Sequence, residues 1–131
     1  SPVSVSKPFL DFPNMVRGEK TLKIAYVFTT ALSQKILNTM IIPQLEEKRH
    51  GVDVVGMFFF GDNTFFLLNG TDMASRLHKI QQQNGMLLMA CDQCAYERNI
   101  AMSLVEGARI GCFPDLYAAL GPAAPDQVIT L

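Results

Sequence analysis

Two hydrophobic patterns alternate along the chain from Leu22 to its end. Short apolar runs rich in β-branched and aromatic residues have the length of strands, whereas longer segments with apolar positions three and four residues apart are typical of helices. The runs at 52–60 and 86–90 are almost continuously apolar, as in strands that are buried on both faces of a sheet. The expected strands are Leu22–Phe28, Val52–Phe60, Met86–Ala90, Ala108–Phe113 and Gln127–Leu131.

Helical patterns fill the intervals between these strands. Pro43 lies inside the first of them and predicts a kink, and Gly51 is a suitable residue to end that helix. Turn residues at 61–63 follow the second strand, and Phe65–Leu68 is expected to be a short extended segment. The expected helices are Ser33–His50, a second from Thr71 or Asp72 to Gln83, Gln93–Glu106 and a short one at Asp115–Leu120.

The order of these elements predicts the fold class. Strands that alternate with helices indicate a mostly parallel sheet with helices on both faces. We therefore expect residues 21–131 to form one three-layer α/β/α domain with a five-stranded sheet. Residues 1–20 contain three prolines without apolar periodicity, and they are expected to be a flexible or partner-packing leader.

Composition narrows the function classes. The 131 residues have a net charge of −1, which gives no electrostatic basis for binding nucleic acid or an anionic membrane. No apolar run reaches the length of a membrane span, and the first residues lack the pattern of a signal peptide. Three cysteines make a disulfide framework improbable and favour reduced, reactive or metal-binding thiols. Glycine-rich phosphate-binding motifs are absent, so no cofactor is expected.

Cys91 is the strongest candidate for chemistry. It directly follows a buried strand and precedes a helix, so it is expected at the carboxyl edge of the sheet, where ligands bind in such folds. Backbone N–H groups at a helix N-terminus are expected to stabilise its thiolate and lower its pKa. A thiolate there can attack a sulfane sulfur and hold it as a persulfide. The alternative is an unreactive cysteine in the core.

The other two cysteines leave more alternatives open. Cys94 completes a C-x-x-C pair with Cys91, and it can be a resolving thiol, a second relay thiol or an inward-packing helix residue. Cys112 is expected in the core of the fourth strand. A structural metal site would need a further ligand, either His50 or His78, and both histidines are expected at the surface.

Three polar residues are candidates to support the cysteines. Arg98 lies one helical turn after Cys94 and can stabilise a thiolate or bind an anionic sulfur donor, or it can form an ordinary surface ion pair. Asp62 and Asn63 follow the second strand at the same sheet edge, where they can approach Cys91 or act only as turn formers.

Three segments together resemble the DsrE/TusD (DsrE/F-like) family of small sulfur-transfer proteins. They are KIAYVFTT at the first strand, VVGMFFFGDNTFFLLNG at the second strand and its loop, and NGMLLMACDQCAYERNI at the third strand and helix. The final QVITL matches the closing strand of the family. The resemblance covers residues 20–131 and implies the DsrE-like α/β fold.

The resemblance also implies a function. The active cysteine of the family corresponds to Cys91, and its basic residue corresponds to Arg98. The implied protein is a cytoplasmic carrier that receives sulfur from a donor protein, hands it to an acceptor protein and forms a homo-oligomer, a trimer or hexamer. TusD-like members lack a cysteine at the position of Cys94, whereas other relatives have one. Two alternatives stay open: a dithiol redox protein that uses both cysteines, and a non-catalytic oligomeric or metal-binding subunit.

Overall fold

A computed structural model describes residues 21–131, and the expected leader at 1–20 lies outside the described residues. Five strands form one sheet in the order β4-β3-β2-β1-β5, and all neighbouring strands are parallel. The strands are β1 (Lys23–Phe28), β2 (Asp53–Phe59), β3 (Leu87–Cys91), β4 (Ala108–Gly111) and β5 (Gln127–Thr130). The helical segments are α1 (Ala31–Ile36), η2 (Leu37–Ile41), α2 (Ile42–Glu46), η3 (Gly61–Leu67), α3 (Asp72–Asn84), α4 (Asp92–Glu97) and α5 (Phe113–Ala123).

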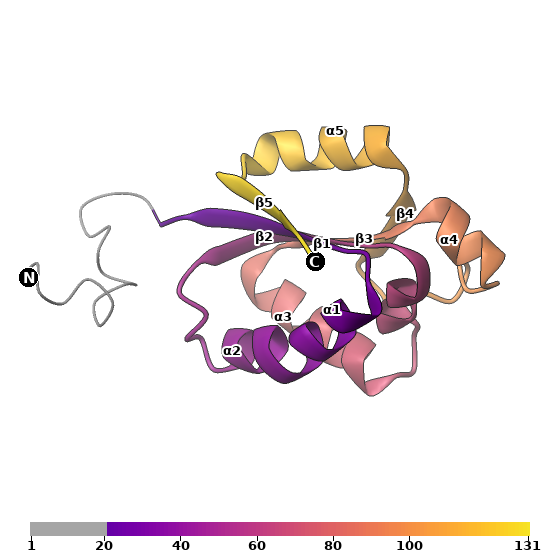
Figure 1. Cartoon of the computed structure of the whole chain (residues 1–131), viewed down its shortest axis with the longest axis horizontal. Coiled ribbons are helices and arrows are strands. Elements are labelled where there is room, and N and C mark those ends of the chain that lie inside the picture. Colours follow the sequence, from indigo (N-terminus) through magenta and orange to yellow (C-terminus); the bar gives the residue numbers. More distant parts are fainter. Residues whose placement is uncertain (1–20) are drawn as a thin grey trace, which may run out of the picture.

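The strand order decides which face each helix covers. The chain moves in one direction across the sheet from β1 to β4, so right-handed connections place α1, α2 and α3 on one face. The return from β4 to β5 runs the other way, and α5 therefore covers the opposite face (Figure 1). Helix α4 lies beyond the carboxyl end of β3 (Figure 1). The predicted three-layer α/β/α architecture is confirmed.

Alternation of side chains along the strands produces two separate cores. In β1, Ile24, Tyr26 and Phe28 face the layer of α1, α2 and α3, whereas Ala25 and Val27 face α5. The first core is the larger one and includes buried residues of η2, α2, η3 and α3, whereas α1 contributes the partly buried Ile36. The second core lies under α5 alone. Its buried members are Ala25, Phe58, Met89, Cys91, Leu116 and Leu120.

The first helical region runs without interruption from α1 through η2 to α2. It begins earlier than expected, because Thr30 caps it by accepting a hydrogen bond from the backbone N–H of Ser33. The segment η2 is a π-helix that directly precedes the turn containing Pro43. Proline has no N–H for the helical ladder, and a wider turn is a common way to accommodate the lost bond. The helix ends at Glu46 rather than His50, and Lys48 then adopts a left-handed φ of 58°.

Two loop regions differ from the predicted elements. Residues 61–67 form the 3-10 helix η3 rather than a turn and an extended segment. The helix expected at 93–106 ends at Glu97, and Asn99 then takes a left-handed φ of 60°. Its later apolar residues pack from a loop instead, since Val105 is buried and Leu104 bridges to Leu68. An apolar spacing of three and four residues cannot distinguish this loop from a helix face.

The last helix is longer than predicted and starts where the fourth strand was expected to continue. Cys112 is its N-cap, and the Asp115 side chain accepts a hydrogen bond from the Cys112 backbone N–H at 2.9 Å. Pro114 fits the first turn, where no N–H is required. The helix continues through Gly121 and Pro122 to Ala123.

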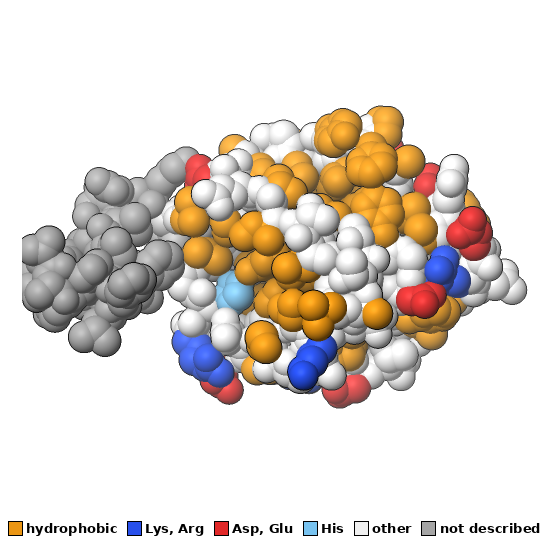
Figure 2. Space-filling model, viewed as in Figure 1, with side chains coloured by type: hydrophobic (Ala, Val, Ile, Leu, Met, Phe, Trp, Pro, Cys, Tyr) orange, Lys and Arg blue, Asp and Glu red, His pale blue; other side chains and the backbone are white. Residues whose placement is uncertain are grey.

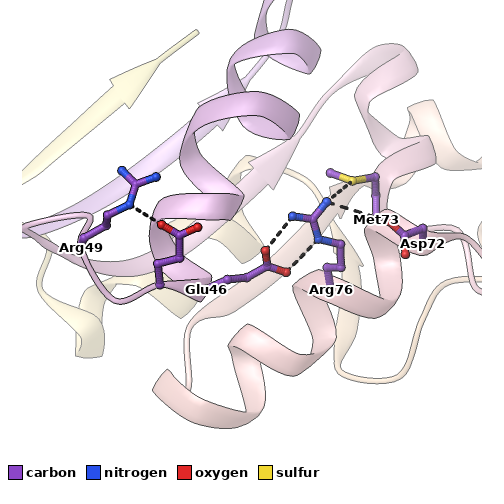
Figure 3. Close-up of polar contacts among 6 residues, drawn as sticks. Glu46, Arg49, Asp72, Met73 and Arg76 are labelled. Atoms are coloured by element: carbon purple, nitrogen blue, oxygen red, sulfur yellow. Dashed lines mark hydrogen bonds and ion pairs between the residues drawn. The ribbon is translucent and has the colours of Figure 1, made fainter.

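Helices α2 and α3 are joined by a bidentate ion pair (Figure 3). Arg76 donates to both carboxylate oxygens of Glu46, at 2.6 and 2.8 Å, and this pairing lowers the pKa of Glu46. Arg76 also contacts Asp72 and the Met73 sulfur on its own helix. Two-pronged Arg–carboxylate pairs fix orientation, so the contact sets the relative placement of the two helices.

All helices of the described residues are short. The longest single α-helix, α3, has 13 residues, and α5 has 11, whereas the continuous run of α1, η2 and α2 spans Ala31–Glu46. In the chain from 21 to 131, no helix combines the length and apolar character needed to cross a membrane.

His50 is part of a hydrogen-bonded chain and not a free surface residue. Its Nε2 lies 2.8 Å from the Tyr26 hydroxyl, and its Nδ1 lies 2.9 Å from Oε1 of Gln44. Since the Gln44 oxygen only accepts, Nδ1 bears the proton and Nε2 accepts from Tyr26. Burial raises the pKa of Tyr26 and lowers the pKa of His50, so both groups are held neutral.

We expect His50→Gln to make stability less dependent on pH between about 7.5 and 5.5. Because the pKa of His50 is lowered in the folded protein, the unfolded chain takes up this proton first as pH falls. The stability that neutral His50 contributes is fully present above the pKa of this histidine in the unfolded chain. It is lost as pH falls through the lower pKa of His50 in the folded protein. Urea unfolding at several pH values measures the slope. The wild type measured in parallel is the reference, and an unchanged slope in His50→Gln would contradict the prediction.

Candidate functional site

The carboxyl edge of the sheet brings the ends of β3 and β4 together. Cys91 ends β3 and pairs in register with Gly111, which ends β4. The connection after β3 packs Val105 into the core of α1, α2 and α3, whereas β4 leads into α5 on the opposite face. The connections that leave these two neighbouring strands therefore lead to opposite faces of the sheet. Ligand sites of parallel α/β sheets form at such points, so Cys91 occupies a favourable position for a reactive group.

Cys91 faces the core beneath α5. Its side chain is only 7% exposed and shares that core with Met89 and Phe58. Phe60 lies at the edge of the same cluster, with ring centroids 4.7 Å from Phe58 and 5.4 Å from Phe113. The thiol is therefore enclosed by apolar and aromatic side chains, with little contact with water.

Cys94 lies beside Cys91, at the edge of the same core. The two side chains interact directly, and both thiols are free. Cys94 is half-buried and packs against the edge of the core that contains Cys91. The two cysteines of the C-x-x-C segment are therefore neighbours in space. Both a sulfur relay and a dithiol redox site require such a pair.

Burial raises the pKa of the Cys91 thiol, contrary to the sequence prediction. Desolvation is the largest cause, and the neighbouring Cys94 side chain also raises this pKa. The backbone N–H groups of Cys94 and Gln93 act in the opposite direction but do not overcome the burial. Helix α4 has only six residues, so few aligned peptide groups favour the thiolate. Cys91 is therefore held as a thiol until a reaction partner accepts its proton.

Arg98 connects α4 to η3. Its Nε donates to Asp62 at 2.9 Å, and its Nη1 donates to the backbone carbonyl of Cys94 at 3.1 Å. Two predicted supporting residues, Arg98 and Asp62, are thus brought together in an ion pair. The guanidinium also interacts electrostatically with the Cys94 thiol and with Glu97. Arg98 therefore fixes the helix that follows Cys91 and places a positive charge near the second sulfur.

Asn63 anchors the other side of η3. It is buried, donates from Nδ2 to the Thr30 carbonyl at 3.2 Å and accepts from the Ser33 hydroxyl at 3.2 Å. These hydrogen bonds connect it to the start of α1, whereas its neighbour Asp62 turns toward α4. The adjacent Asp62 and Asn63 therefore hold the loop between two different helices.

The remaining candidates are Cys112, which follows the register partner of Cys91, and the histidines. Cys112 is half-buried at the start of α5, and its sulfur accepts from the backbone N–H of Asp115 instead of packing inside a strand. The Nδ1 atom of His78 is buried and has no hydrogen-bond partner among the described residues, so this histidine is not simply solvated. Within residues 21–131, no group of three or more His, Cys, Asp or Glu side chains is placed to hold a metal.

Sequence reasoning did not identify the aromatic contacts that α5 contributes. Phe113 was expected at the end of a strand, but it begins α5 and contacts Phe58, Phe60 and Tyr117. Pro114 and Asp115 directly follow Phe113, and this pattern is typical of a helix start. It could have placed Phe113 at the beginning of α5.

Comparison with solved structures shows the fold. The YchN protein of E. coli has a TM-score of 0.59 and 19% identity, over 86% of this chain and 100% of that one. BT1422 of Bacteroides thetaiotaomicron, a conserved protein of unknown function, has a TM-score of 0.59 and 15% identity. The match covers 83% of this chain and 94% of BT1422. MTH1491 of Methanobacterium thermoautotrophicum, also of unknown function, has a TM-score of 0.58 and 10% identity, over 84% and 99%.

These three structures have the DsrE-like fold, and this chain shares their α/β architecture. No family model matches the sequence, and no curated protein matches it. At such low identities, the likeness establishes the fold and leaves the chemistry to be argued from the site.

We expect Asn63→Ala to lower the free energy of unfolding by about 1–3 kcal/mol, because it leaves the buried Ser33 hydroxyl without its Asn63 acceptor and opens a space between η3 and α1. Urea denaturation measures the difference. Asn69→Ala is the matched control, since Asn69 is exposed in the next loop and should change stability by less than about 0.5 kcal/mol. Equal effects of the two substitutions would show that Asn63 does not anchor the loop.

Proposed function

We propose that this protein is a sulfur carrier that holds sulfane sulfur as a persulfide on Cys91 and passes it to a partner protein. The main supporting observation is the Cys91 thiol itself: it ends β3 where the chain diverges, and it is enclosed in an apolar site beside a second free thiol. The DsrE-like fold and the resemblance in sequence agree with this proposal, but both are weaker support than the site.

The environment of Cys91 suits storage of sulfur. A persulfide is destroyed when a thiol from solution attacks it, so a site that excludes bulk water and bulky external thiols prolongs its lifetime. Phe58, Phe60 and Phe113 form aromatic contacts beside the core that contains Cys91. Loading transfers one sulfane sulfur from the donor to the Cys91 sulfur: the donor S–S bond breaks, the donor leaves as a thiolate, and the sulfane sulfur supplies the oxidising equivalents, so no further oxidant is needed.

A dithiol redox protein is the second candidate function. The proximity of the two free thiols, Cys91 and Cys94, favours it, because neighbouring thiols can close a disulfide with loss of two protons and two electrons to an oxidant. The third alternative, a metal-binding subunit, has no support among residues 21–131, where the cysteines and histidines do not form a metal-binding group.

We expect reduced wild-type protein to gain sulfur atoms of about 32 Da when it is incubated with a sulfane-sulfur donor, because a thiolate accepts such sulfur directly. Intact mass followed by peptide mapping identifies the modified residue. The expected site at the end of the incubation is Cys91, and Cys91→Ser should lose this modification. Cys112→Ser is the matched control and should load like the wild type.

Two results would contradict this assignment. If peptide mapping of the loaded wild type finds no sulfur on Cys91 at the end of the incubation, another residue stores the sulfur. If the wild type instead loses about 2 Da without gaining sulfur, the pair closes a disulfide and the dithiol function is correct.

An apolar surface extends over α5 and β5, and its end at Phe113 is next to the site. Phe113, Tyr117 and Val128 are 45%, 66% and 53% exposed, and Asp115 is the only charged residue of these two elements. Figure 2 shows hydrophobic side chains gathered over α5 and continuing toward the middle of this view. Exposed apolar patches of this kind mark interaction sites. We infer that a second copy of the chain covers this surface, in a trimer or hexamer as the resemblance implies.

Replacement of both Phe113 and Tyr117 by Ser should convert this assembly to monomers, because it removes the largest exposed apolar side chains of the surface. Light scattering coupled to size-exclusion chromatography measures the molar mass. Met102→Ser is the control, since Met102 is 93% exposed in the loop after α4 and should leave the assembly intact. A monomeric wild type, or a double variant of unchanged mass, would contradict the inference.

A further inference from the structure

We propose that Cys94 is the entry thiol of the site: it receives sulfur from the donor first and passes it to Cys91, which stores it. This order rests on the proposed function, because it assigns successive roles to the two sulfurs of a carrier. Two differences between the cysteines support it, namely their exposure and their electrostatic surroundings. Their proximity to each other then allows the second transfer.

Exposure separates the two thiols. Cys91 is 7% exposed under α5, where Met89 and Phe58 share its core, so a bulky donor has little access to its sulfur. Cys94 is half-buried at the edge of the same core, one helical turn further along the chain. Rates of thiol–disulfide and thiol–persulfide exchange depend on access to the attacking sulfur, so a donor meets Cys94 first.

The charge of Arg98 also favours Cys94. Its guanidinium donates to the Cys94 carbonyl at 3.1 Å, is held in place by Asp62 at 2.9 Å and interacts electrostatically with the Cys94 thiol. A guanidinium beside the more exposed thiol also attracts an anionic sulfur donor. At Cys91, desolvation raises the pKa of the thiol. Attack on an external donor is therefore easier at the outer thiol.

Direct contact allows the second transfer. The Cys94 thiolate first attacks the outer sulfur of a donor persulfide, the donor S–S bond breaks, and its electron pair leaves with the donor thiolate. The Cys91 sulfur then attacks the outer sulfur now attached to Cys94, and the Cys94 sulfur leaves with the bonding pair. The Cys91 proton passes to the departing Cys94 sulfur, which lies beside it at the edge of the same core. One sulfane sulfur moves in each step, and no oxidant or reductant is consumed.

The test measures how fast each cysteine is loaded. Full-length wild type, Cys94→Ser, Cys91→Ser and the control Cys112→Ser are mixed with glutathione persulfide, quenched with an alkylating reagent at successive times and mapped by mass spectrometry. We expect persulfide to appear on Cys94 before Cys91 in the wild type. In Cys94→Ser, loading of Cys91 should slow by about tenfold or more, because the bulky donor must reach the buried thiol directly. In Cys91→Ser, the persulfide should stay on Cys94.

A smaller donor distinguishes loss of the entry thiol from structural damage to the Cys91 site in Cys94→Ser. Inorganic hydrogen disulfide can reach the enclosed thiol more easily, so Cys94→Ser should slow its transfer to Cys91 much less than transfer from glutathione persulfide. A misfolded Cys91 site would slow both donors alike. The Cys91→Ser measurement does not depend on the fold of Cys94→Ser, so it tests the order independently.

The outcomes separate this inference from the proposed function. If wild type and Cys94→Ser load Cys91 at the same rate from glutathione persulfide, the entry role is wrong and the carrier function stands. Absence of sulfur from Cys94 in Cys91→Ser also overturns the entry role. If the wild type releases sulfide and closes a Cys91–Cys94 disulfide, Cys94 resolves the persulfide instead. If the wild type gains no sulfur at all, the proposed function fails and the inference fails with it.

Discussion

The handedness of the connections between parallel strands determines how the rest of this molecule is arranged. Three successive connections step in one direction across the sheet, and their helical segments cover one face; only the return from β4 to β5 covers the other. The second face therefore has a single helix, α5, over a core of few residues. Cys91 faces this thinner layer, at the point where the chain diverges between β3 and β4. Both its enclosure and the apolar surface beside it follow from this one constraint.

Burial and the helix N-terminus act in opposite directions on the Cys91 thiol. A charge at a helix terminus gains typically 0.3–1 kcal/mol, and α4 has only six residues, whereas desolvation of a buried group shifts a pKa by up to several units. Desolvation is the larger effect here. It raises the pKa of the Cys91 thiol, so the helix N-terminus does not activate this thiol. A buried thiol of this kind is better suited to storing sulfur than to attacking a donor in solution. This is why the more exposed Cys94, next to Arg98, gains a role of its own.

The loop η3 holds the site together from two sides. Asp62 pairs with Arg98 of the α4 region, and the adjacent Asn63 is hydrogen-bonded at the start of α1. Consecutive residues point to opposite partners because the 3-10 helix rotates each position by about a third of a turn. The position of α4, and with it that of Cys94, thus depends on a loop that is more than 25 residues away in the sequence. The fold and the cysteine site are coupled through this short segment.

The sequence by itself determined the strands, their parallel arrangement, the three-layer class and the place of Cys91 at a strand end. These features depend on local periodicity and on general rules of connection, which a single chain displays directly. Tertiary structure decided the end of α4, the start of α5 and the partners of Asn63 and His50, because each depends on packing between distant segments. It also decided the protonation of Cys91. Local sequence shows only the helix that favours a thiolate, whereas the desolvation that opposes it comes from residues of β2 and α5.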